Sequence, residues 1–549
     1  MSLSIQCLLA LGALIAASGA GLAQSPSIER PGEPRCPGGS PAVIRSVAQS
    51  CLAPAQTLNI PWSGYGHDAQ HTAVSAVAAQ NLTKVHWKTP VDQNPPGGGS
   101  GPLYVHYGSL LATAGNTVIV PVTTSAGGYQ LEAFNGANGT LLYTLPSDYA
   151  LPPHDWTPPY GPALANGTRI YYPGAGGTLY YRDLPDSATG PNGQAGATGQ
   201  LAFYGMTGST GYTSNQAAYN SAVQISTPLT TDRFGDVFFG FTVTGSNPAN
   251  LVNGIARVNG AGSGTWTSAV SLTGDPLAGQ IALNSAPALN SSGTTLYVAT
   301  SNGIEYGAGY LASVNATTLT PATHVQLFDP RGGLATVSTD SSASPMAGPD
   351  GDVYFGVLEE SPCCSSHNDR GWLLHFNSTL TQTKTPGSFG WDDTASVVPS
   401  TAVPSYSGAS SYLILTKYNN YADVGTGNGV NKIAILDPSA TQQDEYATSP
   451  VTVLQEVITV TGLTPDSAHG GLPAVREWCI NTAAIDPFTK SAVINSEDGT
   501  LYRWNFTTNT LAQSLNLTAG RGEAYTPTAI GPDGTVYAIN DAILFAVGN

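Results

Sequence analysis

One pattern recurs along the whole chain: a short apolar run, a tight turn rich in Gly, Asp and Asn, a second apolar run, a polar loop and a third apolar run. The clearest copies are residues 345–355 (PMAGPDGDVYF) and 527–537 (PTAIGPDGTVY). Such a repeat indicates the blades of a propeller or the turns of a solenoid, because each unit can bury its faces only against its neighbours.

The order of the runs predicts an all-β fold, an eight-bladed β-propeller of four-stranded antiparallel blades, with seven blades as the alternative if one unit is an insertion. Residues 82–89 form one alternating strand without a nearby partner, whereas residues 527–547 supply only three strands. We therefore expect the N- and C-terminal strands to complete one blade, because a closed ring leaves no exposed sheet edge. Between them, strand pairs are expected at 117–123 with 129–134, 169–173 with 179–183, 237–242 with 254–258, 296–300 with 310–314, 353–358 with 372–376, 412–418 with 432–436, and 491–495 with 501–505.

Composition limits the cellular compartment that the protein can occupy and the classes of partner that it can bind. The chain has 64 Gly and 40 Pro among 549 residues, as a turn-dense β protein requires, and its formal charge of −17 argues against nucleic acid and anionic membranes as partners. Residues 1–23 have the pattern of a secretory signal peptide, and no later run reaches the roughly 18 apolar residues of a membrane helix. We expect a secreted or periplasmic monomer without membrane insertion, in which residues 24–80 form an extension packed on a propeller of residues 81–549.

Five cysteines follow the signal peptide. In an oxidising compartment Cys36 and Cys51 are the natural pair, and their disulfide would stabilise the extension by about 3 kcal/mol in the chain-entropy model. Cys363 and Cys364 are adjacent, so a bridge between them would be strained, because neighbouring Cα atoms lie only about 3.8 Å apart. Either they form this vicinal disulfide or they have separate fates, such as a bond from one of them to Cys479. Otherwise Cys479 is a buried free thiol.

Three motifs resemble the quinoprotein (PQQ-like) propeller family. Residues 133–143 (AFNGANGTLLY) are similar to its blade motif A-x-D-x-x-T-G-x-x-x-W, residues 62–72 (WSGYGHDAQHT) to the opening of its members, and residues 497–505 (EDGTLYRWN) to its strand–turn–strand pattern. The resemblance implies a propeller over most of the chain and makes PQQ and Ca²⁺ candidate cofactors, although many such propellers bind none. Residues 363–371 (CCSSHNDRG) loosely resemble the C-C-D-x-x-N-R-G segment that lies beside the cofactor in the family's alcohol dehydrogenases, but the intervening residues and the place relative to the strands differ.

Antiparallel order predicts two unequal faces. In a four-stranded blade, the first and third turns open on one face and the remaining connections open on the other. The first set is short, as at residues 165–168, 290–293 and 348–351, and we call this side the short-turn face. The other side, the loop face, collects most of the aromatic, charged and cysteine side chains found in loops. Because binding and catalytic residues usually sit on loops of a rigid scaffold, the sequence predicts the functional site on the loop face.

The candidate residues on the loop face form three groups. Acid–base candidates are His367, Asp392, Arg476, Glu477 and Tyr525. Candidates for contact with a flat cofactor or a sugar are Glu305, Cys363, Cys364, Trp391 and Trp478. Candidate Ca²⁺ ligands are Glu305, Asp393 and Glu523. The alternative for any single carboxylate is a salt bridge or a loop cap, and on a strand only one of the neighbours Asp392 and Asp393 would enter the site.

Three functions remain open. The first is a propeller that binds a small molecule, a glycan or a protein on its loop face without catalysis. The second is a PQQ- and Ca²⁺-dependent dehydrogenase of alcohols or sugars, and the third is a polysaccharide lyase that uses residues such as His367 and Tyr525. The lack of a recognisable quinone-site motif favours the first function. The chain also lacks C-x-x-C-H, H-E-x-x-H, G-x-S-x-G and Walker A motifs, so a covalently attached haem is not expected.

Overall fold

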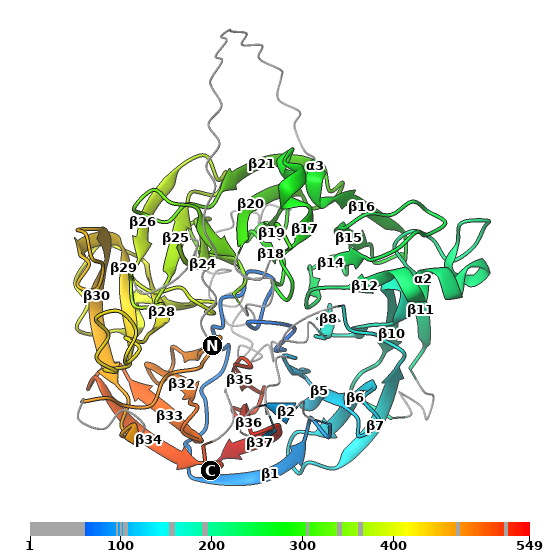
Figure 1. Ribbon diagram of the computed structural model, residues 1–549. Coiled ribbons are helices and arrows are strands. Elements are labelled where there is room, and N and C mark those ends of the chain that lie inside the picture. The colour runs from blue at the N-terminus through cyan, green and yellow to red at the C-terminus, as the bar shows by residue number, and fades with distance from the viewer. Residues whose placement is uncertain are drawn as a thin grey trace, which may run out of the picture. The chain divides into compact units, whose positions relative to one another are not determined.

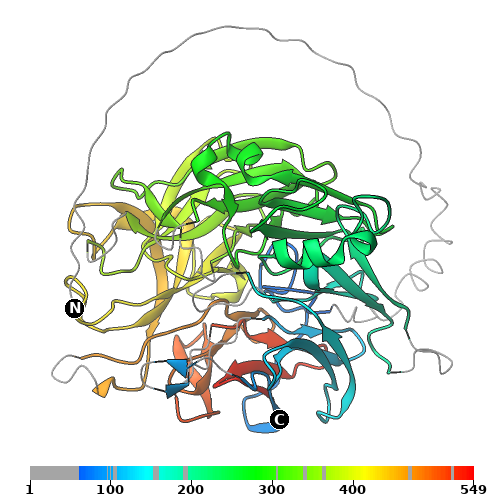
Figure 2. The same cartoon turned by 45° about the vertical axis from the view of Figure 1, so that its right-hand side comes forward.

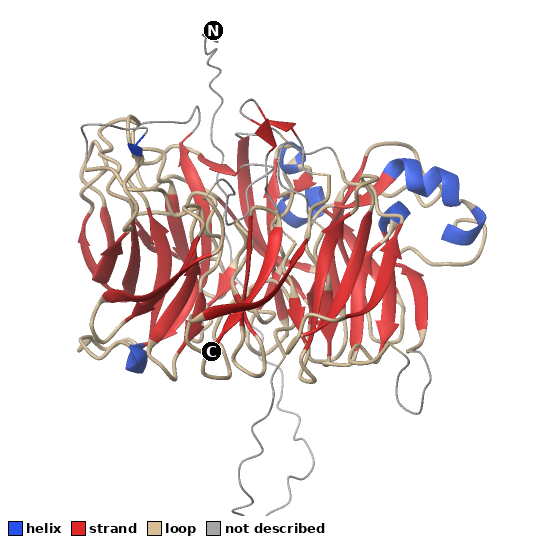
Figure 3. Ribbon diagram, turned by 90° about the horizontal axis from the view of Figure 1, so that it is seen from below, coloured by secondary structure: helices blue, strands red, loops and turns tan. Residues whose placement is uncertain are grey.

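The computed structural model describes residues 61–94, 97–98, 101–102, 108–152, 160–188, 196–303, 307–337, 343–360, 366–467, 473–520 and 525–549. They belong to one unit, Asn59–Asn549. Within this unit the sheets stand around a common axis (Figure 1), and a second view shows the same arrangement turned by 45° (Figure 2). Figure 3 shows that the strands run between two faces on which the turns and loops lie.

Most of the described strands form separate antiparallel sheets with the strand order of blades. The four-stranded sheets are β4 (Leu111–Ala112), β5 (Thr117–Thr123), β6 (Tyr129–Asn135) and β7 (Leu141–Ser147); β8 (Ala163–Ala165), β9 (Arg169–Pro173), β10 (Thr178–Asp183) and β11 (Thr198–Ala202); β27 (Ser396–Pro399), β28 (Tyr412–Tyr418), β29 (Lys432–Gln443) and β30 (Thr452–Thr461); and β31 (Ala484–Asp486), β32 (Ser491–Asn495), β33 (Thr500–Asn505) and β34 (Thr510–Asn516). A five-stranded sheet contains β12 (Val223–Ile225), β13 (Thr230–Thr231), β14 (Val237–Val243), β15 (Gly254–Val258) and β16 (Gly264–Ser268).

Two further four-stranded meanders are joined into one ten-stranded sheet. The first is β18 (Ala288–Leu289), β19 (Thr295–Ser301), β20 (Gly307–Asn315) and β21 (Pro321–Gln326), with β17 (Gln280–Ile281) also on β19; the second is β23 (Met346–Ala347), β24 (Val353–Glu360), β25 (Trp372–Phe376) and β26 (Thr383–Gly387). The short strand β22 (Ala335–Val337) pairs with both β20 and β24 and so connects them. The β-propeller class is thus confirmed, while the count of eight blades stays a prediction because of this join.

The N-terminal strand closes the ring as predicted. β1 (Lys84–Pro90) pairs antiparallel with β37 (Ile543–Gly548), which continues through β36 (Val536–Asn540) to β35 (Ala529–Ile530). The indole of Trp87 donates a hydrogen bond to the Gly136 carbonyl at 2.8 Å and packs against Phe134 and Tyr537, as expected for an inter-blade side chain.

Burial follows the position of a strand within its sheet. Every residue of β28 and of β32 is buried, whereas β1 and β34 alternate between exposed and half-buried residues. A middle strand has neighbouring sheets on both of its faces, so its side chains are buried on both. An outermost strand turns alternate side chains to solvent, and its pattern has the period of two that is typical of a half-covered strand.

The segment Trp62–Gln80 runs through the middle of the ring, where Figure 1 shows it in blue. Its backbone is bonded to the innermost strands of successive sheets rather than to a sheet of its own. Its carbonyls accept hydrogen bonds from the amides of those strands: Trp62 from Ala112 at 3.0 Å, Ser63 from Leu164 at 2.7 Å, Ala69 from Leu289 at 2.7 Å, Gln70 from Ala347 at 3.0 Å, Thr72 from Val397 at 2.9 Å and Ala73 from Ile485 at 2.9 Å.

Helices are few and short in the described part of the chain. They are α2 (Gln216–Ala222) and α3 (Ala269–Thr273), with 3-10 turns at Ala175–Gly177, Tyr212–Ser214, Pro276–Ala278 and Ser400–Ala402. None of the described helices has both the length and the apolar character needed to cross a membrane. A hairpin of β2 (Gly97–Gly98) and β3 (Gly101–Pro102) completes the secondary structure.

Candidate functional site

Several predicted site residues fall outside the described part of the chain: Cys36, Cys51, Glu305, Cys363, Cys364 and Glu523. The two disulfides, the contact of Glu305 with a cofactor, and the shares of Glu305 and Glu523 in a Ca²⁺ site therefore stay predictions. Cys479 is described, and its thiol is buried and free of a disulfide.

Four residues of the loop face gather into what we call the Asp393 centre: Asp392, Asp393, Lys417 and Tyr525. Strands β27 and β28 are antiparallel with Ser396 opposite Leu415, so the residues just before β27 lie beside the end of β28 at Lys417. The Lys417 ammonium donates to the Asp392 carbonyl at 2.7 Å and lies 5.4 Å from the centre of the Tyr525 ring. Three of the four are sequence-predicted site residues.

Asp393 is the acid–base group of this centre. Its side chain is almost completely buried, and it accepts hydrogen bonds from the Thr416 hydroxyl and from the Lys417 amide, the latter at 3.3 Å. Burial raises the pKa of Asp393 to about 7, although the Lys417 charge and the Thr416 hydroxyl act in the opposite direction. Near neutral pH this carboxyl can therefore both take up and release a proton, which is the property required of a general acid–base group.

Lys417 brings a buried positive charge to the centre. In the part of the chain that the structure describes, its ammonium makes one hydrogen bond, to the Asp392 carbonyl, and otherwise faces the rings of Phe389 and Tyr525. A lysine ammonium has three donors. Two donors thus remain for an acceptor oxygen. Lys417 lies at the end of the predicted strand at 412–418 and was expected on the loop face, but it was not among the candidate acid–base, cofactor or metal residues.

A second polar cluster lies at Cys479. The Cys479 thiol donates to Glu497 at 3.2 Å, the Glu477 amide donates to the same carboxylate at 3.1 Å, and Arg476 lies 4.0 Å away. The ligand atoms of Glu477, Cys479 and Glu497 all lie within 4.8 Å of one another, so these three residues could hold a metal ion. Glu477 and Arg476 were predicted to take part in a site. Glu497 was missed, since its sequence context, Glu-Asp-Gly, reads as a simple turn.

Two predicted residues are part of the core rather than of the rim. His367 is buried, stacks on Trp372 with ring centres 3.8 Å apart, and bonds the Gly371 carbonyl at 2.9 Å through Nδ1, while its Nε2 lies 3.3 Å from Asp444. Trp478 is 1% exposed and packs edge-on against Tyr502. Packing holds both rings, so the roles predicted for them as a base and a stacking surface remain without structural support. Trp391 is half-buried.

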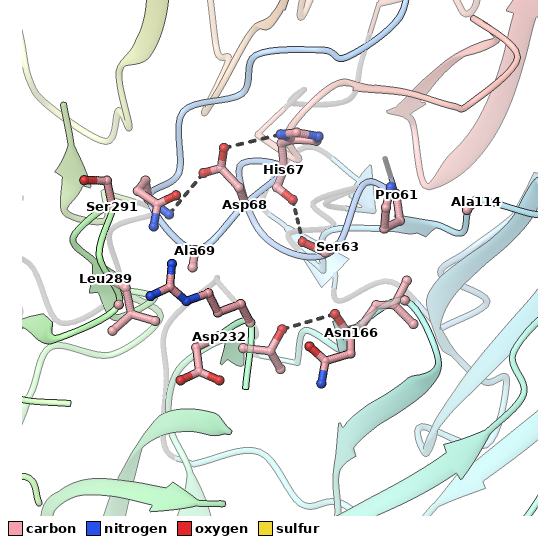
Figure 4. A pocket seen from close by; sticks show the side chains of 16 residues that line it. Pro61, Ser63, His67, Asp68, Ala69, Ala114, Asn166, Asp232, Leu289 and Ser291 are labelled. Carbon is pink, nitrogen blue, oxygen red and sulfur yellow. Dashed lines mark hydrogen bonds and ion pairs between the residues drawn. The ribbon is translucent and has the colours of Figure 1, made fainter. Parts of the chain in front are cut away.

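The short-turn face, on which no functional site was predicted, contains a cavity of about 570 Å³. Figure 4 shows the segment from Pro61 to Ala69 along one side of it and Asn166, Asp232, Leu289 and Ser291 on the other. These opposing residues come from the first turns of three successive blades, β8–β9, β13–β14 and β18–β19. This cavity was not predicted from the sequence, because short turns form a pocket only when the central segment supplies one of its walls.

Asp68 anchors the wall that the central segment contributes. Its carboxylate accepts hydrogen bonds from the amides of Gln70 and Thr72, each at 3.0 Å, and from the Thr72 hydroxyl, and it lies 3.4 Å from Nδ1 of His67. Burial alone would raise the pKa of Asp68, but the bonds from His67 and Thr72 outweigh it and hold the pKa below its usual value. Asp68 is therefore ionised at neutral pH, and both of its carboxylate oxygens already accept hydrogen bonds from the protein.

Comparison with known proteins supports the fold. No protein-family model and no curated protein sequence matches the chain. Among solved structures, the chain is similar to a quinohemoprotein alcohol dehydrogenase from Comamonas testosteroni (TM-score 0.52, 13% identity, covering 90% of this chain and 78% of that one), to a europium-containing methanol dehydrogenase (0.49, 10%, 87% and 89%), and to a quinohemoprotein alcohol dehydrogenase from Pseudomonas putida HK5 (0.48, 12%, 89% and 76%). At these identities the likeness concerns the fold alone: the chain has the β-propeller fold of quinoprotein alcohol dehydrogenases.

Proposed function

We propose that the protein is an oxidoreductase that oxidises a hydroxyl group of a small alcohol or sugar at the Asp393 centre. The observation that carries this proposal is the pairing of a buried carboxyl whose pKa is about 7 with a buried ammonium that has donors to spare. In the reaction the substrate O–H bond releases its proton to Asp393, while the neighbouring carbon loses a hydride, and with it two electrons, to an acceptor. A base with a pKa close to the working pH suits this proton transfer.

The acceptor we propose is PQQ, with Ca²⁺. Described residues that could hold the quinone are Lys417, whose ammonium can donate to a quinone or carboxylate oxygen, and Phe389 and Tyr525, whose rings lie 5.8 and 5.4 Å from that ammonium. When bound, the quinone would supply the two-electron acceptor. The residues of the chain orient it, take the proton and keep water away from the buried carboxyl. Export to the periplasm or the medium is part of the same proposal.

Titration with PQQ and Ca²⁺ tests this proposal. We expect stoichiometric binding that EDTA reverses, with a raised melting temperature. Lys417→Met keeps the volume of the side chain but removes its donors, so it should weaken PQQ binding at least about tenfold. The control is Lys84→Met on the outermost strand β1, where an exposed lysine is replaced and the affinity should not change.

Failure of this titration would favour the alternative function. A wild-type protein that does not bind PQQ, or a Lys417→Met variant that binds it as well as the wild type does, would contradict the dehydrogenase proposal. The protein would then be a propeller that binds a small molecule, a glycan or a protein on its loop face without redox chemistry.

A further inference from the structure

The cavity on the short-turn face is distinct from the Asp393 centre. Its lining comes from the first turns of the blades and from the central segment, whereas the Asp393 centre is built from residues before β27, at the end of β28 and before β35. Its volume of about 570 Å³ falls within the range of about 300–1,000 Å³ that is typical of pockets for small molecules.

Asp232 offers an acceptor at the wall of the cavity. The residue is 7% exposed, and its Oδ1 accepts the amides of Phe234 at 2.8 Å and Asp236 at 2.9 Å. Among the described residues no donor bonds its other oxygen, Oδ2. Burial raises the pKa of Asp232, because these two amides and the more distant Arg257 do not fully compensate for the lost water. A hydroxyl donor from a ligand would supply the missing contact.

Donors and apolar surfaces complete the cavity. Asn166, Arg233 and Ser291 are exposed side chains of three different turns, and the Arg233 guanidinium uses one bond, 3.1 Å to the Ser292 carbonyl, to fix its position. Pro61 and Ala69, both half-buried, contribute apolar surface on the side of the central segment. Alternating donors and acceptors around small apolar surfaces match a pyranose ring, which presents hydroxyls at its edge and C–H groups on its faces.

The charge of the cavity disfavours anions. Two carboxylates, Asp68 and Asp232, face one guanidinium, so the lining has no excess of positive charge, and the whole chain has a formal charge of −17. Asp68 already accepts several protein donors, which makes it a poor metal ligand. We propose that this cavity is a binding site for a neutral saccharide of one or two rings.

Calorimetric titration of the full-length protein with glucose, maltose and cellobiose tests the proposal, with glucuronate as the charged comparison. Ser291→Leu fills the cavity from one turn, whereas Ser246→Leu places the same side chain on an exposed loop position between β14 and β15, outside the lining. We expect at least one neutral sugar to bind, Ser291→Leu to weaken it about tenfold or more, and Ser246→Leu to change its affinity by less than about twofold.

The other outcomes overturn the proposal. Binding of glucuronate in preference to the neutral sugars, no binding of any of them, or equal losses in the two serine variants would each contradict it. Asp393→Asn distinguishes a failure of this proposal from a failure of the proposed function. The substitution should abolish turnover at the loop face and leave sugar binding in this cavity unchanged.

Discussion

Glu359 shows how a single buried side chain can hold a loop of this protein in place. Its carboxylate is completely buried at the end of β24, where it accepts the backbone amides of His367 at 3.0 Å, Asp369 at 3.1 Å and Gly371 at 2.9 Å. No lysine or arginine is bonded to it in the described part of the chain. The carboxylate instead organises the connection between β24 and β25 through amides that would otherwise lack acceptors.

Glu359→Ala should therefore destabilise the protein strongly. It leaves three buried amides without acceptors, and we expect the free energy of unfolding to fall by about 2–4 kcal/mol in urea titrations. Glu360→Ala is the matched control: this side chain is 44% exposed and lies 4.0 Å from Arg331, so its loss should cost less than about 1 kcal/mol. Equal effects of the two substitutions would show that Glu359 does not organise the connection.

His71 makes stability depend on pH. The ring is buried in the central segment and bonds the Pro345 carbonyl at 2.7 Å through Nδ1. Burial lowers the pKa of His71 to about 4, in spite of the raising effects of the Pro345 carbonyl and the Asp68 charge. The unfolded chain, in which the pKa is near its ordinary value, therefore binds a proton before the folded chain does. This contribution to stability is present above about pH 6.5 and is lost as the pH falls toward 4.

His71→Asn removes the titrating ring and suits the positive φ of 63° at this position. The difference in unfolding free energy between wild type and variant should change by about 3 kcal/mol between pH 6.5 and pH 4, to the disadvantage of the wild type. Asp393, whose raised pKa favours the folded state at lower pH, acts in the opposite direction but is present in both proteins and cancels. A difference that does not vary with pH would mean that His71 is not buried as a neutral ring.

At the scale of elements, the central segment Trp62–Gln80 links the sheets through backbone bonds. Its turn depends on Gly66, which has a φ of 59°, and a Cβ at this position would lie 2.9 Å from both Cα and Cβ of His71. The turn brings the following residues back across the middle of the ring, where their carbonyls meet the amides of β18, β23, β27 and β31. The segment therefore acts as a common partner for innermost strands that are too short to hold one another.

Gly66→Ala should loosen these contacts. We expect faster hydrogen exchange at the amides of Leu289, Ala347, Val397 and Ile485, which donate to the segment, with little change in the outer strands. The control is Gly274→Ala, which also has a positive φ, 72°, but has open space around the new Cβ. If both variants exchange like the wild type, the segment is not needed to hold the inner strands.

The sequence predicted where the strands lie along the chain better than it predicted which distant residues come into contact. The predicted strand at 117–123 is β5, and the pair at 491–495 and 501–505 matches β32 and β33 to within one residue, because short, largely apolar runs between turn residues leave little freedom for the strand bounds. The path of Trp62–Gln80 could not be predicted, since it depends on backbone amides and carbonyls, which carry no sequence signal.

At the scale of the whole molecule, the closed ring of blades explains why a candidate site lies on each of its two faces. Antiparallel blades place their longer connections on one side, and the sequence located Asp392, Asp393 and Tyr525 there without showing that they share a centre with Lys417. That contact depends on the register of β27 against β28 and on a ring that brings residues from distant blades together. The cavity of the opposite face was missed for the same reason, because its walls come from three blades and the central segment.

The most direct measurement is the pH dependence of kcat/KM for primary alcohols and aldose sugars, with protein reconstituted with PQQ and Ca²⁺ and an artificial electron acceptor. The proposed role of Asp393 predicts activity that rises with pH through an inflection at about 7, as the carboxyl loses its proton, and a loss of at least about a hundredfold in Asp393→Asn. PQQ should still bind to that variant. No PQQ-dependent oxidation of any of these substrates, or an Asp393→Asn variant as active as the wild type, would contradict it.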